Sequence, residues 1–477
     1  MPSRVSKTTA CSFCQGDHFG QATVFPMAGK LRGAGNQGRR PAAERSAEWR
    51  PFWAKGLHQL VWWTWAAALA CGWGCQAADS GCPSSGCPPE SLEPSTSSAA
   101  AGPPSARADL ADQPASGGWP LWRGDRAGTG QAAAALPEPL HRQWTFQAAQ
   151  GGFEATAVIA EGCVYIGTTD GPFYAIDLQT GRQRWVFNEG AGYLAPAAAA
   201  DGLVFVGDVQ GRFFALRQSD GQPAWRFEAE AEINGGPNVY QDRVLFGSQD
   251  GCLYCLQAAN GRLVWKYQSP DQIRCFPSVW NDYALVAGCD GRLHLVNLQT
   301  GKPAGVVELK GPTGCTPAVW DDLAFVGTEA RQFFAIDLRQ RKILWTFESP
   351  KSKQSFRSSA AVTPEAVYVG CRDRHVYALD RKTGQVLWQF AARGQVDSSP
   401  VVVGERIFVG SEDGRLYGLD RRSGQVVWQF DLGGQVLASP AVADRRLVIG
   451  NTDGQLYCFG PPDRMDASNR SSASDQQ

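Results

Sequence analysis

The sequence has few of the residues and motifs that usually carry enzyme chemistry. It contains only five histidines, and no GxSxG, HExxH, phosphate-binding-loop or paired DxD motif occurs in it. None of its 14 cysteines is adjacent to another. The formal net charge is only −1, so a nucleic-acid partner is not expected. These absences direct attention from catalysis to architecture.

The histidines and aspartates that remain have structural interpretations. His294 stands in a sequence column that is otherwise aromatic, which favours a core position over a catalytic one. Aspartates recur at the same place in the repeat described below, where they are expected to close hairpins, at Asp170, Asp250, Asp290, Asp413 and Asp453. We therefore predict no catalytic residue and no metal ligand.

What the sequence does contain is a motif of about forty residues that returns along most of its length. One copy reads VYIGTTDGPFYAIDLQTGRQRWVF, from Val164 to Phe187. The fourth copy has Gly305 at the position where the other full copies have a tryptophan. The tryptophans of the full column, which we expect to stabilise the blades, are Trp144, Trp185, Trp225, Trp265, Trp345, Trp388 and Trp428.

Each copy alternates apolar and polar residues with a period of two, which indicates β-strands rather than helices. A GxxDG run and a DxxTG run divide the copy, and both are typical of hairpin turns because glycine adopts positive φ at low cost. A preceding inner segment brings the copy to four strands, the size of one propeller blade. The sequence therefore predicts an all-β, eight-bladed β-propeller of four-stranded antiparallel blades.

The two ends of the repeat region complement each other. The eighth copy stops near Pro461 without a tryptophan strand, whereas Leu140 to Phe146 (LHRQWTF) supplies one before the first copy. Pairing this strand with the last three would complete the eighth blade and leave no open sheet edge between blades. We predict that the strand containing Trp144 closes the ring.

The N-terminal region resembles a targeting sequence. Residues 1–56 form a basic extension with nine Lys/Arg against three Asp/Glu. Met27 is an alternative start within it, and a start there would leave the part before Met27 untranslated. Residues 57–75 are uncharged, with an apolar centre of about fourteen residues that suits a signal peptide or membrane anchor but is short for a bilayer span. Cleavage before Cys71 would also permit lipidation of that cysteine, so export with membrane association through this segment is expected.

Three further segments follow from composition. Residues 76–118 are rich in Ser, Pro and Ala and are predicted to be a disordered linker, residues 119–461 form the propeller, and residues 462–477 form a polar tail. A CxxC pair at Cys11 and Cys14 has no second pair at zinc-finger spacing, so metal binding is not the favoured interpretation.

The most variable column of the repeat lies three residues before the inner-strand proline. Its members are predicted to ring one mouth of the central channel, and the polar ones are our candidates for binding a ligand or partner: Glu154, Asn234, Arg274, Arg357 and Asp397. A solvated rim without a partner is the alternative. Cys275 and Cys315 share the next column, where either a disulfide or two buried thiols would fit.

The AxDxxTGxxxW signature from Ala175 to Trp185 and from Ala378 to Trp388 resembles the pyrroloquinoline quinone (PQQ) repeat. The run WPLWRGDRAGTG, from Trp119 to Gly130, is similar to a motif that opens many exported propellers of this kind. The resemblance implies the propeller fold but covers two functional classes. One contains quinoprotein dehydrogenases, and the other contains non-catalytic propellers such as the BamB lipoprotein of the outer-membrane β-barrel assembly machinery.

The resemblance favours the second class. The dehydrogenases typically carry an adjacent Cys-Cys pair and calcium-binding carboxylates in inserted loops, and this sequence has neither feature. We therefore expect a monomeric, exported scaffold without a cofactor, in the periplasm or at the outer membrane, that binds a protein partner in the cell envelope. A PQQ-dependent oxidoreductase using PQQ with calcium is the alternative, and a ligand-sensing or carbohydrate-binding propeller is the second alternative.

Overall fold

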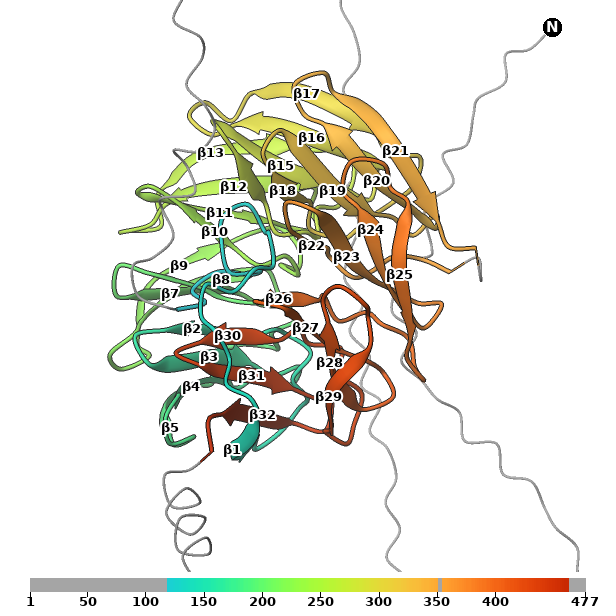
Figure 1. Ribbon diagram of the computed structural model, residues 1–477. Helices are drawn as coiled ribbons and strands as arrows, with labels where there is room; N and C mark the ends of the chain where they lie inside the picture. Colours follow the sequence, from blue (N-terminus) through green and yellow to red (C-terminus); the bar gives the residue numbers. More distant parts are fainter. Residues whose placement is uncertain (1–117, 351–353, 463–477) are drawn as a thin grey trace, which may run out of the picture. The chain divides into compact units, whose positions relative to one another are not determined.

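The computed structural model describes residues 118–350 and 354–462. In these residues all regular structure is β-sheet, arranged as eight four-stranded antiparallel sheets (Figure 1). Seven sheets are built from consecutive strands, and we number them as blades 1 to 7 in chain order, from β2–β5 to β26–β29. Blade 8 consists of β30, β31, β32 and β1. The prediction of an eight-bladed propeller is confirmed.

The innermost strand of each blade is only two or three residues long. These strands are β2 (Val158–Ala160), β6 (Ala198–Ala200), β10 (Asn238–Tyr240), β14 (Ser278–Trp280), β18 (Ala318–Trp320), β22 (Ala361–Val362), β26 (Val401–Val403) and β30 (Ala441–Ala443). Inner strands of neighbouring blades lie in contact, and β2 contacts both β6 and β30. The first and last blades are therefore neighbours in a closed ring.

The middle strands carry the most buried side chains, because they have sheet neighbours on both edges and adjacent blades against their faces. The second strands are β3 (Cys163–Gly167), β7 (Leu203–Gly207), β11 (Arg243–Gly247), β15 (Tyr283–Ala287), β19 (Leu323–Gly327), β23 (Ala366–Cys371), β27 (Arg406–Gly410) and β31 (Arg446–Gly450). The third strands are β4 (Phe173–Asp177), β8 (Arg212–Arg217), β12 (Cys252–Gln257), β16 (Arg292–Asn297), β20 (Gln332–Asp337), β24 (His375–Asp380), β28 (Arg415–Asp420) and β32 (Gln455–Gly460).

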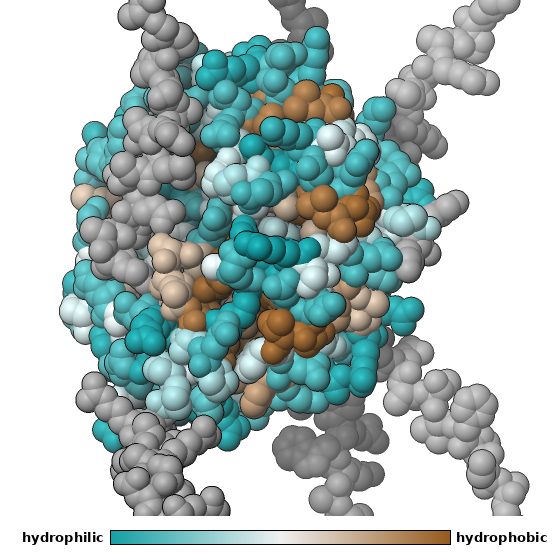
Figure 2. Space-filling view, viewed as in Figure 1, coloured by the Kyte–Doolittle hydropathy of each residue, from teal (hydrophilic) through white to brown (hydrophobic). Residues whose placement is uncertain are grey.

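The outer strands alternate exposed and partly buried residues, as expected for strands with one face toward solvent. They are β5 (Gln183–Phe187), β9 (Pro223–Glu228), β13 (Leu263–Gln268), β17 (Pro303–Glu308), β21 (Lys342–Glu348), β25 (Val386–Ala391), β29 (Val426–Asp431) and, for blade 8, β1 (His141–Gln147). Nine of the ten exposed large hydrophobic residues lie on these strands. In Figure 2 the hydrophobic residues on the visible face form separate patches within a largely hydrophilic surface.

Strand β1 closes the ring as predicted. It pairs antiparallel with β32, with Trp144 opposite Cys458 and Phe146 opposite Leu456. The indole Nε1 of Trp144 then donates to the carbonyl of Leu178 in blade 1, at 2.9 Å. One side chain from the start of the propeller thus belongs to the last blade and hydrogen-bonds to the first.

The blade tryptophans share one packing arrangement. Each lies opposite a small residue on the third strand, as Trp185 does opposite Ala175, and six of them donate Nε1 to a carbonyl of the next blade at 2.9–3.1 Å. The glycine of the DxxTG turn in that next blade lies directly against the indole. At Gly221, a Cβ atom would approach Trp185 to 2.5 Å, and the residue has a positive φ of 72°. Glycine is required there both for space and for backbone conformation.

Candidate functional site

A cavity lies on the propeller axis, at the end of the ring where the inner strands begin. Its volume is about 160 Å³. Every blade contributes the residue of the variable column to its lining: Glu154, Leu194, Asn234, Arg274, Gly314, Arg357, Asp397 and Leu437. The structure thus brings all five polar candidates to one cavity. Leu194 of blade 2 completes the column, although the sequence analysis did not include it.

The segment from Trp119 to Ala132 runs along the inner strands of the ring (Figure 1, cyan), and its Trp122 lines the cavity. Its backbone pairs with the open edges of these strands, which would otherwise have unsatisfied polar groups. The bonds run from the amides of Ile159, Ala199, Val279, Val319, Val362 and Val402 to carbonyls of this axial segment. The motif similarity placed the segment at the start of the propeller but gave no indication that it fills the channel.

Two neighbouring residues of the axial segment, Trp122 and Arg123, bond to residues at the start of the inner strands. Trp122 lines the cavity, and its Nε1 donates to Thr316 Oγ1 at 3.0 Å. Arg123 is 1% exposed and donates to the carbonyls of Ala360, Ser399 and Pro400. Burial lowers the pKa of the Arg123 guanidinium to about 9, so it keeps its charge at neutral pH. A positive charge therefore lies among the inner strands of blades 6 and 7.

A ring of hydroxyl groups links the blades around the cavity. Backbone N–H groups of Thr316, Ser359, Ser399 and Ser439 each donate to the hydroxyl of the equivalent residue in the following blade, at 2.8–2.9 Å. The last of these bonds runs from Ser439 to Thr156 and so crosses the junction between blades 8 and 1. A hydroxyl recurring two residues after the variable column was the sequence signal for this ring, and the sequence analysis did not use it.

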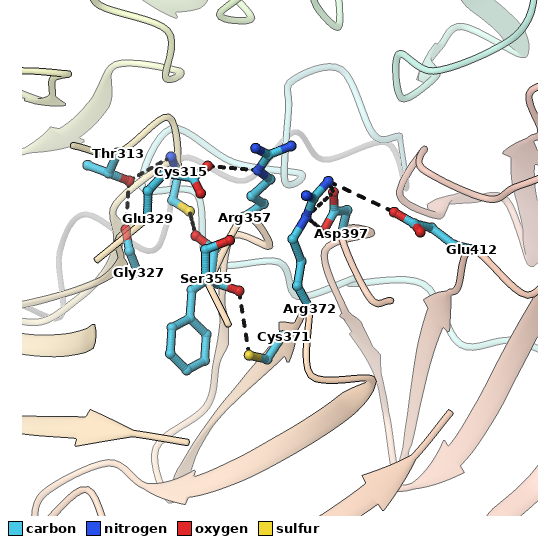
Figure 3. Close-up of polar contacts among 11 residues, drawn as sticks. Thr313, Cys315, Gly327, Glu329, Ser355, Arg357, Cys371, Arg372, Asp397 and Glu412 are labelled. Atoms are coloured by element: carbon cyan, nitrogen blue, oxygen red, sulfur yellow. Dashed lines mark hydrogen bonds and ion pairs between the residues drawn. The ribbon is translucent and has the colours of Figure 1, made fainter. Parts of the chain in front are cut away.

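The rim between blades 5 and 7 carries paired charges (Figure 3). Arg357 Nε donates to Glu329 Oε1 at 2.7 Å. Arg372 binds both carboxylate oxygens of Asp397, at 2.7–3.1 Å, and lies 4.0 Å from Glu412. Burial, followed by repulsion from Asp397, raises the pKa of Glu412. Asp397 is thus neutralised by a bidentate arginine, which the sequence analysis did not identify.

Two of the three remaining candidates belong to a polar network on blades 3 and 4, and the third, Glu154, lines the cavity from blade 1. Arg274 donates to Gln272 Oε1 at 3.0 Å and to Gln249 Oε1 at 2.9 Å. Asn234 donates to Glu232 at 3.3 Å, and Gln249 donates to the same carboxylate at 2.6 Å. The amide of Gln249 therefore connects Arg274 to Glu232. Hydrogen bonds hold this side of the rim in place.

Cys275 and Cys315 are both free, buried thiols, so the alternative of a disulfide between them does not hold. Cys315 Sγ donates to the carbonyl of Phe356 at 3.1 Å (Figure 3), and Cys275 Sγ accepts the amide of Ala287 at 3.3 Å. Burial raises the pKa of each thiol to about 12. Both therefore remain protonated at neutral pH and act as small packing residues.

His294 is 2% exposed and lies between Tyr267 and Asp290. Its Nδ1 is 3.0 Å from the Tyr267 hydroxyl, and its Nε2 is 2.9 Å from Asp290 Oδ2. In blades 3 and 7 a tyrosine occupies the position of the histidine and donates to the hairpin aspartate, as Tyr417 does to Asp413 at 2.6 Å. Three of the five hairpin aspartates named from the sequence are thus bonded to a third-strand side chain of their own blade.

The described residues contain neither a cluster of metal-binding side chains nor a membrane-spanning helix. Across residues 118–350 and 354–462, no three His, Cys, Asp or Glu side chains cluster closely enough to hold a metal ion. The same residues include no helix long and apolar enough to cross a membrane. The basic extension with Cys11 and Cys14, the 57–75 segment with Cys71, almost all of the 76–118 linker and the polar tail lie outside the described residues.

Fold and repeat together define a β-propeller of the PQQ-like repeat class. The family model for outer membrane protein assembly factor BamB matches residues 115–272, 188–303, 271–394 and 372–463. The chain therefore belongs to this family, as its repeat signature indicated. No curated protein sequence matches the chain.

Three solved structures illustrate the breadth of the fold. BamB from Moraxella catarrhalis is 20% identical, with a TM-score of 0.59, over 68% of this chain and 98% of that one. Quinohemoprotein alcohol dehydrogenase from Comamonas testosteroni is 15% identical, with a TM-score of 0.62, over 72% and 81%. The computationally designed Ika8 protein is 16% identical, with a TM-score of 0.60, over 67% and 99%. At these identities the similarity establishes the fold alone, since one fold serves many functions.

Proposed function

We propose that this protein is a non-catalytic propeller that binds a protein partner in the bacterial cell envelope through the channel mouth. The observation that carries the proposal is the filled channel. The axial segment pairs with the inner strands, so what remains on the axis is a shallow polar cavity open at one end. Charged and amide side chains around it suit contact with another polar surface.

The cavity does not fit PQQ with calcium. Its volume of about 160 Å³ is below the roughly 300–1,000 Å³ of pockets that enclose cofactor-sized ligands. Calcium requires about six to eight oxygen ligands, whereas the rim carboxylates Glu329 and Asp397 are each paired with an arginine. The fold is therefore compatible with the quinoprotein alternative, whereas the size and charge pairing of the cavity do not support it.

The envelope location rests on two observations. The family to which the chain belongs is that of an outer membrane protein assembly factor, BamB. The uncharged 57–75 segment has the pattern of an export signal. Lipidation at Cys71 would tether the exported propeller to a membrane, with residues 76–118 as the linker. A monomeric scaffold is consistent with outer strands whose exposed hydrophobic residues are dispersed.

The proposal is tested by site-specific photo-crosslinking in isolated envelopes. A photoreactive leucine analogue in place of Leu194, at the mouth, should capture a discrete protein, whereas the same analogue at position 427, on the outer strand of blade 7, should not. Purified full-length protein should retain no quinone absorbance after incubation with PQQ and calcium, and should not oxidise alcohols or sugars with an electron-accepting dye. Equal crosslinking at both positions, or cofactor retention with turnover, would overturn the proposal.

A further inference from the structure

The hydroxyl groups of the ring around the cavity have O–H donors that no protein group in the described residues uses. Thr156, Ser359, Ser399 and Ser439 line the cavity, and each is at most 5% exposed. Each hydroxyl oxygen already accepts one backbone N–H, which leaves its own O–H to donate. Across the described residues, none of these four hydroxyls donates to a protein acceptor. Four hydroxyl donors around one axis are therefore available to an oxygen acceptor that enters the cavity.

The local charge favours an anionic acceptor. The buried guanidinium of Arg123 binds the carbonyls of Ala360, Ser399 and Pro400, and within the described chain no carboxylate lies within ion-pair distance of it. Asp125, in the same segment, acts on Arg123 electrostatically, and burial raises the pKa of the Asp125 carboxyl.

Arg357 adds a positive charge at the opening. It uses Nε to bind Glu329, and its two terminal nitrogens have no partner among the residues that the structure describes. Two acidic residues also line the cavity: Asp397, which is held by Arg372, and Glu154, which enters from blade 1. A guanidinium with two available nitrogens is suited to a carboxylate, which it can bind through two hydrogen bonds.

The size of the cavity limits what can enter. A cavity of about 150 Å³ accommodates a molecule such as benzene, so about 160 Å³ admits one side chain or one chain terminus and no folded element. Leu194, Leu437 and Phe276 give the cavity apolar walls around the polar base, which suits a carboxylate on a short carbon stem.

We infer that the axial cavity is a recognition site for a single carboxylate group of a protein partner, held by the hydroxyl ring and Arg357. This inference rests on the proposed function and adds the chemistry of the contact. The carboxylate comes from a C-terminus or from a Glu or Asp side chain, and both sources present the same two oxygens to the same donors.

The test uses the purified full-length protein and unlabelled N-acetylated Gly/Ser pentapeptides, with binding measured by isothermal titration calorimetry. One peptide has a free C-terminal carboxylate, one is amidated and neutral, and one is amidated with a central glutamate. We expect either carboxylate-bearing peptide to bind at least 10-fold more tightly than the neutral one. The stronger of the two identifies the source. Equal binding of the neutral peptide overturns the inference, and so does binding of free acetate without binding of either charged peptide.

Variants assign the binding to the cavity. Gly314→Leu should abolish it by filling the mouth, and it should fold, because a Cβ at Gly314 meets only Arg274 Cβ at 3.6 Å. Arg357→Gln should weaken it at least fivefold, whereas Arg393→Gln, a matched change at an exposed arginine outside the lining, should leave it unchanged. Peptide binding that persists in Gly314→Leu overturns the cavity as the site.

The two proposals fail separately. If envelope crosslinks form at position 194 but no peptide binds, the carboxylate site is wrong and the partner surface stands. If carboxylate peptides bind but no crosslink forms at the mouth, the partner proposal is wrong and the cavity retains its chemistry.

Discussion

Arg341 occupies the space over Gly305 that a tryptophan fills elsewhere in the propeller. A Cβ atom on Gly305 would lie 2.6 Å from Arg341 Nε. At the equivalent junction of blades 1 and 2, the roles are reversed: Trp185 lies against Gly221. The two residues that break the repeat, one in blade 4 and one in blade 5, therefore face each other. A long side chain and a glycine exchange places, so the junction between the blades remains filled.

This exchange predicts strong coupling between the two positions. Gly305→Trp alone should destabilise the protein, because the new indole meets the Arg341 side chain. Arg341→Gly alone should also destabilise it, because the space over Gly305 becomes a void. The double variant should restore the tryptophan–glycine pair, with an indole N–H near the carbonyl of Leu338.

Chemical denaturation of the four proteins measures the coupling as a double-mutant cycle. Residues in direct contact commonly show interaction energies of about 0.5–3 kcal/mol, and we expect at least about 1 kcal/mol in favour of the double variant. Additive losses would mean that the two positions do not compensate for one another. Val427→Trp, at an exposed position on the outer strand of blade 7, controls for the addition of an exposed indole.

The repeat made the fold predictable, but it concealed what is not repeated. The tryptophan column and Trp144 follow from spacing, because the same residue recurs at the same step. The Gly305–Arg341 exchange does not, since the partners lie in different blades and meet only after the blades pack. The axial segment escaped prediction for another reason: it binds mostly through backbone groups of the inner strands, which leave no mark on side-chain identity.

The candidate site was predictable to the same extent. The variable column gave the five polar candidates because one equivalent residue per blade must meet at the axis. Arg372 and Glu329, which pair with two of them, belong to turns that follow the second strands, and their approach depends on the tilt of the blades. The role of Trp122 depends on where the axial segment enters, which no periodicity specifies.

Ring closure predicts unequal effects for deletions at the two ends. Removing Leu140 to Phe146 deletes most of β1, exposes the edge of β32 and removes the bond from Trp144 to Leu178. Removing residues 462–477 leaves all 32 strands in place. Thermal unfolding followed by circular dichroism should show a much lower midpoint for the first deletion and almost no change in midpoint for the second. Equal midpoints would contradict closure by β1.

The DxxTG turn of blade 1 predicts a measurable pKa change. The hydrogen bond from Arg184 to Asp177, with further bonds from Thr180, lowers the pKa of Asp177 to about 2. A lowered carboxyl pKa stabilises the fold above the unfolded value near 4 and loses that contribution as pH falls toward 2. Arg184→Gln should therefore raise the pKa of Asp177 and leave stability unchanged below about pH 2.

Carboxyl chemical shifts in an NMR titration report the Asp177 pKa directly. Asp380 provides an internal control, because Thr383 and backbone amides lower its pKa without a neighbouring arginine bond. Its pKa should not move in the Arg184 variant. An Asp177 pKa that stays near 2 after the substitution would assign its shift to the turn hydrogen bonds instead.

Loss of the buried Arg123 charge should loosen the axial segment locally, beside blades 6 and 7. Arg123→Met keeps most of the side-chain volume but removes the donors that bind the carbonyls of Ala360, Ser399 and Pro400. Each buried acceptor that loses its partner costs about 1–3 kcal/mol, so we expect a loss of at least about 2 kcal/mol in unfolding free energy. Hydrogen exchange distinguishes this from a general destabilisation. The amides of Val362 and Val402, which bind the segment beside Arg123, should exchange faster, whereas the amide of Val279 should change less. Uniform acceleration at all three amides would show that Arg123 stabilises the whole ring, because the segment would then not detach from blades 6 and 7 first.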